Sequence, residues 1–147
     1  MHDLIIVYSK TGNTLSVAKR LQEVTNVSIE EVHATTDDPN TTLVTLTTIP
    51  DVRLHHHIVF GSPVHGFMPP KITQAYLQAL PDLQGKTFDL FVTHYFPWAA
   101  FGGNQTLRAI KKIIEAKHGE VRHMISINWT SKKRAKTIEH LVNVLSQ

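Results

Sequence analysis

Three polar loops of this chain carry residue types suited to holding a ligand, and each loop follows a short apolar run. They are residues 9–14 (SKTGNT), 61–70 (GSPVHGFMPP) and 93–104 (THYFPWAAFGGN). The first gathers hydroxyl and amide groups around one glycine where a helical pattern begins, which suits a phosphate group. The other two combine glycines with aromatic rings, which suits a flat, amphipathic ring with polar edges.

The loop at residues 9–14 predicts an anion site. Gly12 permits a tight turn, and the N-terminus of the helix that follows offers unpaired N–H groups and a positive dipole. Charge-assisted hydrogen bonds of about 1.5–3 kcal/mol each would hold a phosphate dianion. The loop is neither a Walker A loop nor a Gly-x-Gly-x-x-Gly dinucleotide loop. On composition alone, a helix N-cap with a polar turn explains it equally well.

The elements that must position these loops follow from the hydrophobic pattern. Apolar runs typical of buried parallel strands occupy residues 4–8, 27–32, 55–61, 87–93 and 121–129. Helical periodicity occupies residues 14–24, 69–80, 104–118 and 131–145. This alternation predicts an α/β fold with a parallel sheet and helices on both faces. Ligands bind such sheets beyond the carboxyl ends of the strands, where the three loops are expected.

The helical stretches also predict which side chains face the core. The expected inner faces are Leu15, Ala18, Leu21 and Val24 in the first helix, Ile72, Ala75, Tyr76, Ala79 and Leu80 in the second, and Ile138, Leu141, Val142 and Leu145 in the last. Residues 35–52 favour neither a helix nor a clear strand, although Asp38-Pro39 is expected to cap a short helix there.

Taken in order, the three loops resemble those of the flavodoxin family. Residues 8–14 (YSKTGNT) are similar to the flavodoxin loop that holds the phosphate of FMN, and the two later loops are similar to those that flank the flavin ring. The resemblance covers essentially the whole chain. It implies a flavodoxin-like three-layer sandwich, with a five-stranded parallel sheet in the order 2-1-3-4-5 and helices on both faces. It also implies one FMN-binding domain over residues 1–147, of the short-chain type.

The resemblance places FMN on residues of these loops. They are Ser9, Lys10, Thr11, Gly12, Asn13 and Thr14 for the phosphate, and Ser62, Pro63, Val64, His65, Gly66, Phe67, Thr93, His94, Tyr95, Trp98, Gly102 and Gly103 around the ring. Tyr95 or Trp98 is expected to stack on the ring. Gly66 is expected in the peptide that reorients as the flavin gains its first proton. The tryptophan usual in the first ring loop is absent, so Val64, His65 or Phe67 must replace it.

The function that the resemblance implies is electron transfer by non-covalently bound FMN, between a reductase and redox enzymes. The alternative is an FMN-dependent NAD(P)H:quinone-type oxidoreductase, in which basic residues attract a phosphorylated nicotinamide. An activator flavodoxin of ribonucleotide reductase shares the first loop but has less similar ring loops. A flavodoxin-like interaction module without FMN is disfavoured by the intact first loop. No catalytic side chain is expected, since the flavin supplies the redox chemistry.

Composition excludes other classes of protein. With 147 residues, 41% hydrophobic and 18% charged, the sequence describes a soluble globular domain and not a disordered chain. No apolar run approaches the roughly 20 residues of a membrane span. The absence of cysteine excludes disulfides, thiolate metal sites and thiol catalysis. We expect a cytoplasmic monomer or weak dimer with redox partners and no nucleic-acid partner.

The net charge of +3 is unevenly distributed. Residues 1–103 carry six Lys/Arg and nine Asp/Glu, whereas residues 104–147 carry nine and three. Lys132, Lys133, Arg134 and Lys136 begin the last helix, and Arg108, Lys111 and Lys112 are expected in the first two turns of the preceding one. The helix dipole opposes cations at these positions. The pattern favours an anionic partner near the cofactor edge, with a merely solvated face as an equal alternative.

The histidines divide into two groups. The run at residues 55–57 does not predict a metal site, because successive strand residues point to opposite faces of the sheet. His65 and His94 lie on the ring loops, where a histidine can donate a hydrogen bond to a flavin or make its potential depend on pH. An ordinary loop histidine is the alternative for both.

Overall fold

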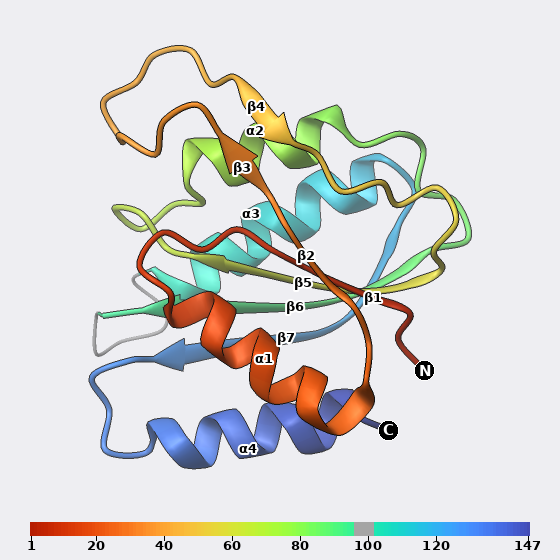
Figure 1. The fold of residues 1–147 in the computed structure, drawn as a ribbon, viewed down its shortest axis with the longest axis vertical. Coiled ribbons are helices and arrows are strands. Elements are labelled where there is room, and N and C mark those ends of the chain that lie inside the picture. Colours follow the sequence, from red (N-terminus) through yellow and green to blue (C-terminus); the bar gives the residue numbers. More distant parts are fainter. Residues whose placement is uncertain (96–101) are drawn as a thin grey trace.

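The computed structural model describes residues 1–95 and 102–147. Its main sheet comprises β1 (Leu4–Val7), β2 (Ile29–Glu31), β5 (His57–Pro63), β6 (Thr87–His94) and β7 (Glu120–Asn128), in the order β2-β1-β5-β6-β7 (Figure 1). Every neighbouring pair is parallel. Counting only these five strands, the order is 2-1-3-4-5, so the predicted flavodoxin-like sheet is confirmed.

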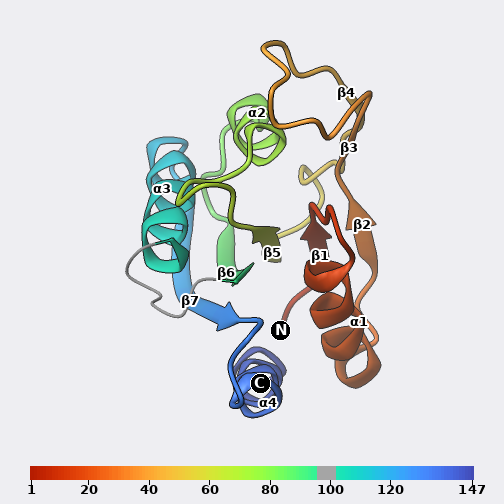
Figure 2. The same ribbon diagram turned by 90° about the vertical axis from the view of Figure 1, so that its left-hand side faces the viewer.

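Helices cover both faces of the sheet, as predicted (Figure 2). They are α1 (Asn13–Thr25), α2 (Lys71–Ala79), α3 (Gly103–Ala116) and α4 (Arg134–Leu145). Ile5 and Val7 of β1 pack in the core cluster that contains residues of α1 and α4, whereas Leu4 and Ile6 pack in the one that contains residues of α2 and α3. Because the central strands are buried on both faces, their sequences read as continuous apolar runs.

The buried face of α1 differs from the predicted stripe. Val17 and Leu21 are buried, whereas Val24 is 49% exposed. A spacing of three residues falls about 60° short of a full helical turn. Three such spacings separate Leu15 from Val24, so the two side chains lie about 180° apart around the helix. In α2, similarly, Ala79 is exposed and Leu77 is buried.

The prediction of a short helix at Asp38-Pro39 is wrong. The chain there forms an antiparallel pair, β3 (His33–Ala34) with β4 (Leu46–Thr48), outside the main sheet. In the connecting loop, the Asp38 N–H donates to Thr36 Oγ1 at 3.1 Å and the Asn40 N–H donates to Asp38 Oδ1 at 2.9 Å. Such side-chain bonds complete local turns and compete with a helix, while the β-branched residues around them favour extended backbone.

The parallel strands bring their carboxyl ends to one edge, and close packing holds two of them together. A Cβ added to Gly61 in β5 would lie 2.2 Å from Cζ of Phe91 in β6, so glycine leaves room for that ring. The Trp129 N–H, just after β7, donates to the His94 carbonyl at the end of β6 at 2.7 Å. No helix in the described part of the chain is long and apolar enough to cross a membrane.

Candidate functional site

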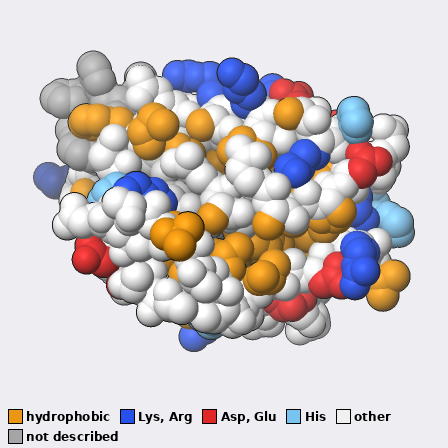
Figure 3. All heavy atoms as spheres, turned by 90° about the horizontal axis from the view of Figure 1, so that it is seen from above, with side chains coloured by type: hydrophobic (Ala, Val, Ile, Leu, Met, Phe, Trp, Pro, Cys, Tyr) orange, Lys and Arg blue, Asp and Glu red, His pale blue; other side chains and the backbone are white. Residues whose placement is uncertain are grey.

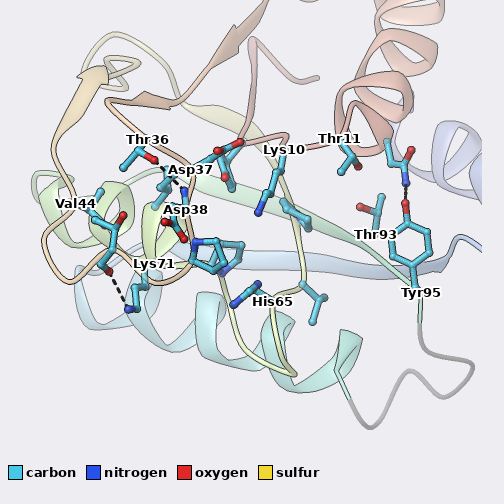
Figure 4. A pocket seen from close by; sticks show the side chains of 18 residues that line it. Lys10, Thr11, Thr36, Asp37, Asp38, Val44, His65, Lys71, Thr93 and Tyr95 are labelled. Atoms are coloured by element: carbon cyan, nitrogen blue, oxygen red, sulfur yellow. Dashed lines mark hydrogen bonds between the residues drawn. The ribbon is translucent and has the colours of Figure 1, made fainter.

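A cavity of about 260 Å³ opens at the carboxyl edge of the sheet (Figure 4). Eight of the predicted site residues line it: Lys10, Thr11 and Asn13 from the first loop, Pro63, Val64 and His65 from the second, and Thr93 and Tyr95 from the third. Three loops that are far apart in the sequence therefore meet at one cavity, at the edge where open parallel sheets bind ligands.

The first loop folds tightly around the N-terminus of α1. Gly12 has a positive φ of 96° and precedes the helix, so the turn needs the freedom of glycine. Ser9 Oγ accepts the Leu15 N–H at 3.2 Å, and buried Thr14 Oγ1 lies 2.9 Å from Thr93 Oγ1. These two predicted phosphate ligands are therefore engaged within the protein, and neither lines the cavity.

The remaining groups of this loop suit an anion. The hydroxyl of Thr11, the amide of Asn13 and the ammonium of Lys10 face the cavity. Within the described residues, the backbone N–H groups of residues 11–13 donate no hydrogen bond. The first turn of α1 holds no acidic side chain that would neutralise the helix dipole. This donor set fits a phosphate group.

The second loop makes a tight turn at the rim of the cavity. The His65 N–H donates to the Met68 carbonyl at 2.8 Å, and the Met68 N–H donates to the His65 carbonyl at 3.0 Å. Between them Gly66 and Phe67 have positive φ angles of 53° and 69°. Glycine adopts this conformation freely, but for phenylalanine it costs about 1–2 kcal/mol. The rim therefore stores backbone strain next to the peptide that we expect to reorient, and that role of Gly66 stays a prediction.

Tyr95 connects the first and third loops. Its ring lines the cavity and its side chain is among the exposed hydrophobics, at 58%. Its hydroxyl accepts a hydrogen bond from Asn13 Nδ2 at 2.7 Å. Trp98, the other candidate for stacking, lies outside the described residues, so the choice between the two stays open.

Other predicted site residues lie behind the cavity and do not line it. Ser62 is buried, donates to the Pro63 carbonyl at 2.8 Å and lies 2.7 Å from Thr73 Oγ1. His94 is 3% exposed. A Cβ on Gly103 would lie 2.0 Å from Ser126 Oγ and 3.1 Å from His94 Cδ2, so glycine allows α3 to approach β6 and β7. Gly102 is also buried. These residues shape the loops around the cavity.

One wall of the cavity was not predicted from the sequence. It is the β3–β4 loop and its flanks, which contribute Thr36, Asp37, Asp38, Pro39, Thr41 and Val44. Lys71 Nζ, at the start of α2, donates to the Thr41 carbonyl at 2.9 Å and ties this wall to the helix. The available signal was positional, because the chain after the second strand of a parallel sheet also emerges at the carboxyl edge.

Charges of both signs surround the cavity. Figure 4 shows Lys10 and His65 between the wall that carries Asp37 and Asp38 and the side that carries Tyr95. Burial, together with the negative charge of Asp37, raises the pKa of Tyr8, which also lines the cavity. The two ends differ, since carboxylates lie at one and the α1 N-terminus at the other. An elongated ligand with an anionic group would be oriented by this difference.

The histidine run lies at the opposite end of β5. His57 Nδ1 is 2.7 Å from Thr87 Oγ1, and the His56 N–H donates to Asp3 Oδ2 at 2.9 Å. Among residues 1–95 and 102–147, no three His, Asp or Glu side chains are arranged to hold a metal ion.

A second hollow lies on the face that carries α2 and the β3–β4 hairpin. It measures about 330 Å³ and is lined by residues 49–53 and by the end of α2 and its flank. Figure 3 shows this face from above, with hydrophobic side chains dispersed among charged ones. Exposed Ile49 contributes to the hollow, and Leu54 lies just beyond its lining. No described residue of the three polar loops lines this hollow, so it is separate from the cavity at the candidate site.

Comparison with known proteins rests on structure. No protein-family model matches the sequence, and no curated protein matches it either. Among solved structures, a flavodoxin from Streptococcus pneumoniae TIGR4 matches with a TM-score of 0.65 and 14% identity, over 97% of this chain and 96% of that one. The chain has the flavodoxin-like fold.

Two further solved structures share this fold. A flavoprotein from Lactobacillus acidophilus, solved in complex with FMN, matches with a TM-score of 0.64 and 17% identity, over 84% of this chain and 91% of that one. The apo form of an NADH:FMN oxidoreductase matches with a TM-score of 0.63 and 13% identity, over 99% and 89%. At sequence identities this low, the structural similarity establishes only the flavodoxin-like fold of the chain.

Proposed function

We propose that this protein binds FMN at the cavity and acts as a small electron-transfer protein between a reductase and redox enzymes. The observation that carries the proposal is the meeting of three elements at one cavity. These are a turn rich in hydrogen-bond donors at the N-terminus of α1, a strained turn at residues 65–68, and an exposed tyrosine. Neighbours that share the fold include a flavodoxin and a flavoprotein solved with FMN.

The residues divide into two groups in this proposal. Thr11, Asn13 and the backbone N–H groups around Gly12 would hold the phosphate, with Lys10 adding positive charge. Val64, His65 and Tyr95 would contact the ring. When bound, FMN supplies the redox chemistry. The protein fixes its position, shields part of it from water and sets the charges around it.

The exposure of the rim favours the carrier. Tyr95 and Met68 are more than half exposed, so one side of the site faces solvent and is accessible to a second protein. The alternative, an NAD(P)H-dependent FMN oxidoreductase, is supported by a neighbour of that activity and by the basic residues near the site.

The test is to add FMN to the purified protein, remove free FMN, and record the visible absorbance before and after anaerobic NADPH or NADH. A carrier retains FMN, and its flavin absorbance is bleached by a chemical reductant but not by either nucleotide alone. Direct bleaching by a nucleotide would establish the oxidoreductase instead. Failure to retain FMN would refute both.

A further inference from the structure

The turn after β7 and the first turn of α4 together carry a cluster of cations. We call residues 131–136 the basic turn; its cations are Lys132, Lys133, Arg134 and Lys136, and all four are exposed. In the described part of the chain, none of them forms an ion pair with a carboxylate. Glu139, one turn further along α4, pairs with Arg20 at 2.9 Å and not with the basic turn.

The position of these cations works against the stability of α4. The first turn of the helix holds no acidic residue, and Lys133 occupies the N-cap position. Each cation there costs about 0.3–1 kcal/mol through the helix dipole. A sequence shaped only for helix stability would place Asp or Glu at these positions. The cluster therefore points to a role outside the fold of the helix.

The basic turn is fixed in place and connected to the rim of the candidate site. The guanidinium of Arg134 lies 4.7 Å from the Trp129 ring centroid, and its Nη1 donates to the Trp129 carbonyl at 2.7 Å. The next residue, Thr130, directs its hydroxyl to the Tyr95 carbonyl at 3.4 Å. One short segment thus links the cations to the backbone of Tyr95, whose side chain is exposed. Figure 2 shows the chain leaving β7 toward α4 at this same end of the sheet.

We propose that the basic turn docks the acidic surface of a redox partner protein, placing that partner against Tyr95 at the rim of the site. The proposal rests on the proposed function, because it names the partner of the same redox site. The exposed apolar side chains of Tyr95 and Met68 would form the centre of the contact, and the cations its rim. Charge of this kind steers encounter and fixes orientation.

The shape of the surface favours a protein over a nicotinamide dinucleotide. Among residues 1–95 and 102–147, those that line the depression beside the basic turn all belong to the segment 129–135: Trp129, Thr130, Ser131, Lys132, Arg134 and Ala135. Pockets for small molecules are concave and bury most of the ligand, commonly between separate elements. A dip within a single turn offers little such burial, whereas exposed cations beside an apolar rim match a protein interface.

The experiment compares two charge-matched double variants of the FMN-loaded protein. Lys132→Glu/Lys133→Glu alters the basic turn, and Lys19→Glu/Lys112→Glu reverses two exposed lysines on α1 and α3. The probe is a reduced acidic plant-type ferredoxin, and the measurement is the stopped-flow rate at which it bleaches the flavin absorbance. Rates are compared at about 0.01 M and about 0.3 M salt, where screening differs strongly.

The first variant is expected to slow the reaction about tenfold or more at low salt, with the difference shrinking at high salt. The control should change the rate less than about twofold, because its lysines lie within α1 and α3 and not in the basic turn. The first variant should melt no lower than the unaltered protein, because Glu at these positions suits the helix dipole. Slower transfer would then not reflect unfolding.

Three outcomes would overturn the proposal. Equal slowing by both variants would mean that net charge alone matters, and unchanged rates would mean that ferredoxin docks elsewhere. A loss of NADPH reduction in the first variant, with an unchanged ferredoxin rate, would assign the cations to a dinucleotide. The visible absorbance of each variant, recorded before the kinetic experiment, shows separately whether it retains FMN. If no variant holds FMN, the proposed function fails, and docking is then tested by calorimetric titration of the protein with oxidised ferredoxin.

Discussion

Asp89, a buried carboxylate remote from the candidate site, allows a quantitative test of how this fold is stabilised. It lies in β6 with its side chain only 3% exposed, at the amino end of the sheet beside the chain start. His2 Nε2 contacts one carboxylate oxygen. The other accepts the His123 N–H at 2.9 Å and lies 2.8 Å from His123 Nδ1. The register of β6 and β7 shifts at this point, which lets His123 reach Asp89 twice.

These contacts decide the charge state of Asp89. Burial opposes ionisation, but the hydrogen bonds and charges of His2 and His123 outweigh it, so the pKa of Asp89 lies below its ordinary value. A carboxyl with a depressed folded-state pKa stabilises the protein above its unfolded pKa of about 3.9. That contribution is lost as the pH falls through the lower, folded-state pKa.

The perturbation is Asp89→Asn, which keeps the shape and one acceptor but removes the charge. Hydrogen bonds to a charged group contribute about 1.5–3 kcal/mol each, so we expect a loss of about 2–4 kcal/mol in the free energy of unfolding at pH 7. Urea denaturation followed by circular dichroism measures it. The difference in the free energy of unfolding between the unaltered protein and Asp89→Asn should become smaller as the pH is lowered from about 5 to about 3, where carboxyl groups titrate.

The matched control is Asp82→Asn. Asp82 also lies 2.8 Å from a histidine, His118, but both side chains are about two-thirds exposed (66% and 68%). Water and salt screen such a pair, so this variant should not differ from the unaltered protein beyond experimental scatter. Equal losses in the free energy of unfolding for both variants would refute the account of a buried, charge-paired carboxylate. So would a loss for Asp89→Asn that did not depend on pH.

Two further predictions concern the residues that hold the loops. Gly61→Ala should lower the free energy of unfolding by about 1–3 kcal/mol, because its Cβ would collide with the Phe91 ring. In the same urea assay, Gly61→Ala/Phe91→Leu should recover part of that loss. If Gly61→Ala caused no loss, the close packing of Gly61 against Phe91 would be contradicted. Thr14→Val should cost about 1 kcal/mol, because it breaks the buried bond to Thr93, whereas Thr11→Val, at an exposed position, should leave thermal stability unchanged. Equal effects of the two threonine substitutions would show that burial of the hydroxyl pair is unimportant.

The sequence predicted the sheet because its central strands are buried on both faces. Runs such as Leu4–Val7, bounded by polar loops, left few alternatives to alternating strands and helices. The expected last helix began a turn too early, since residues 131–133 close local hydrogen bonds before α4 starts at Arg134. Lys111 and Lys112 fall in the third turn of α3 and not in its first two.

The site was predicted less completely than the fold. Loop composition identified three segments that meet at the cavity, but it could not show which side chains face it. The sequence predicts Ser9 and Thr14 as phosphate ligands, and in the structure the side chain of each forms a hydrogen bond within the protein. The wall at residues 36–44 has no periodic pattern, because its turns depend on local side-chain hydrogen bonds. Only tertiary structure could place it against the first loop.

We propose that this protein holds FMN by its phosphate. The most direct test is to titrate the protein with FMN and, separately, with riboflavin, which lacks the phosphate. Flavin fluorescence reports the binding. Two charge-assisted bonds at the α1 N-terminus suffice for FMN to bind about 100-fold more tightly than riboflavin. Thr11→Val should reduce that preference and leave the affinity for riboflavin nearly unchanged, because the Thr11 hydroxyl faces the cavity and is exposed. Equal affinity for the two flavins would contradict the phosphate site, and binding of neither would contradict the proposed function.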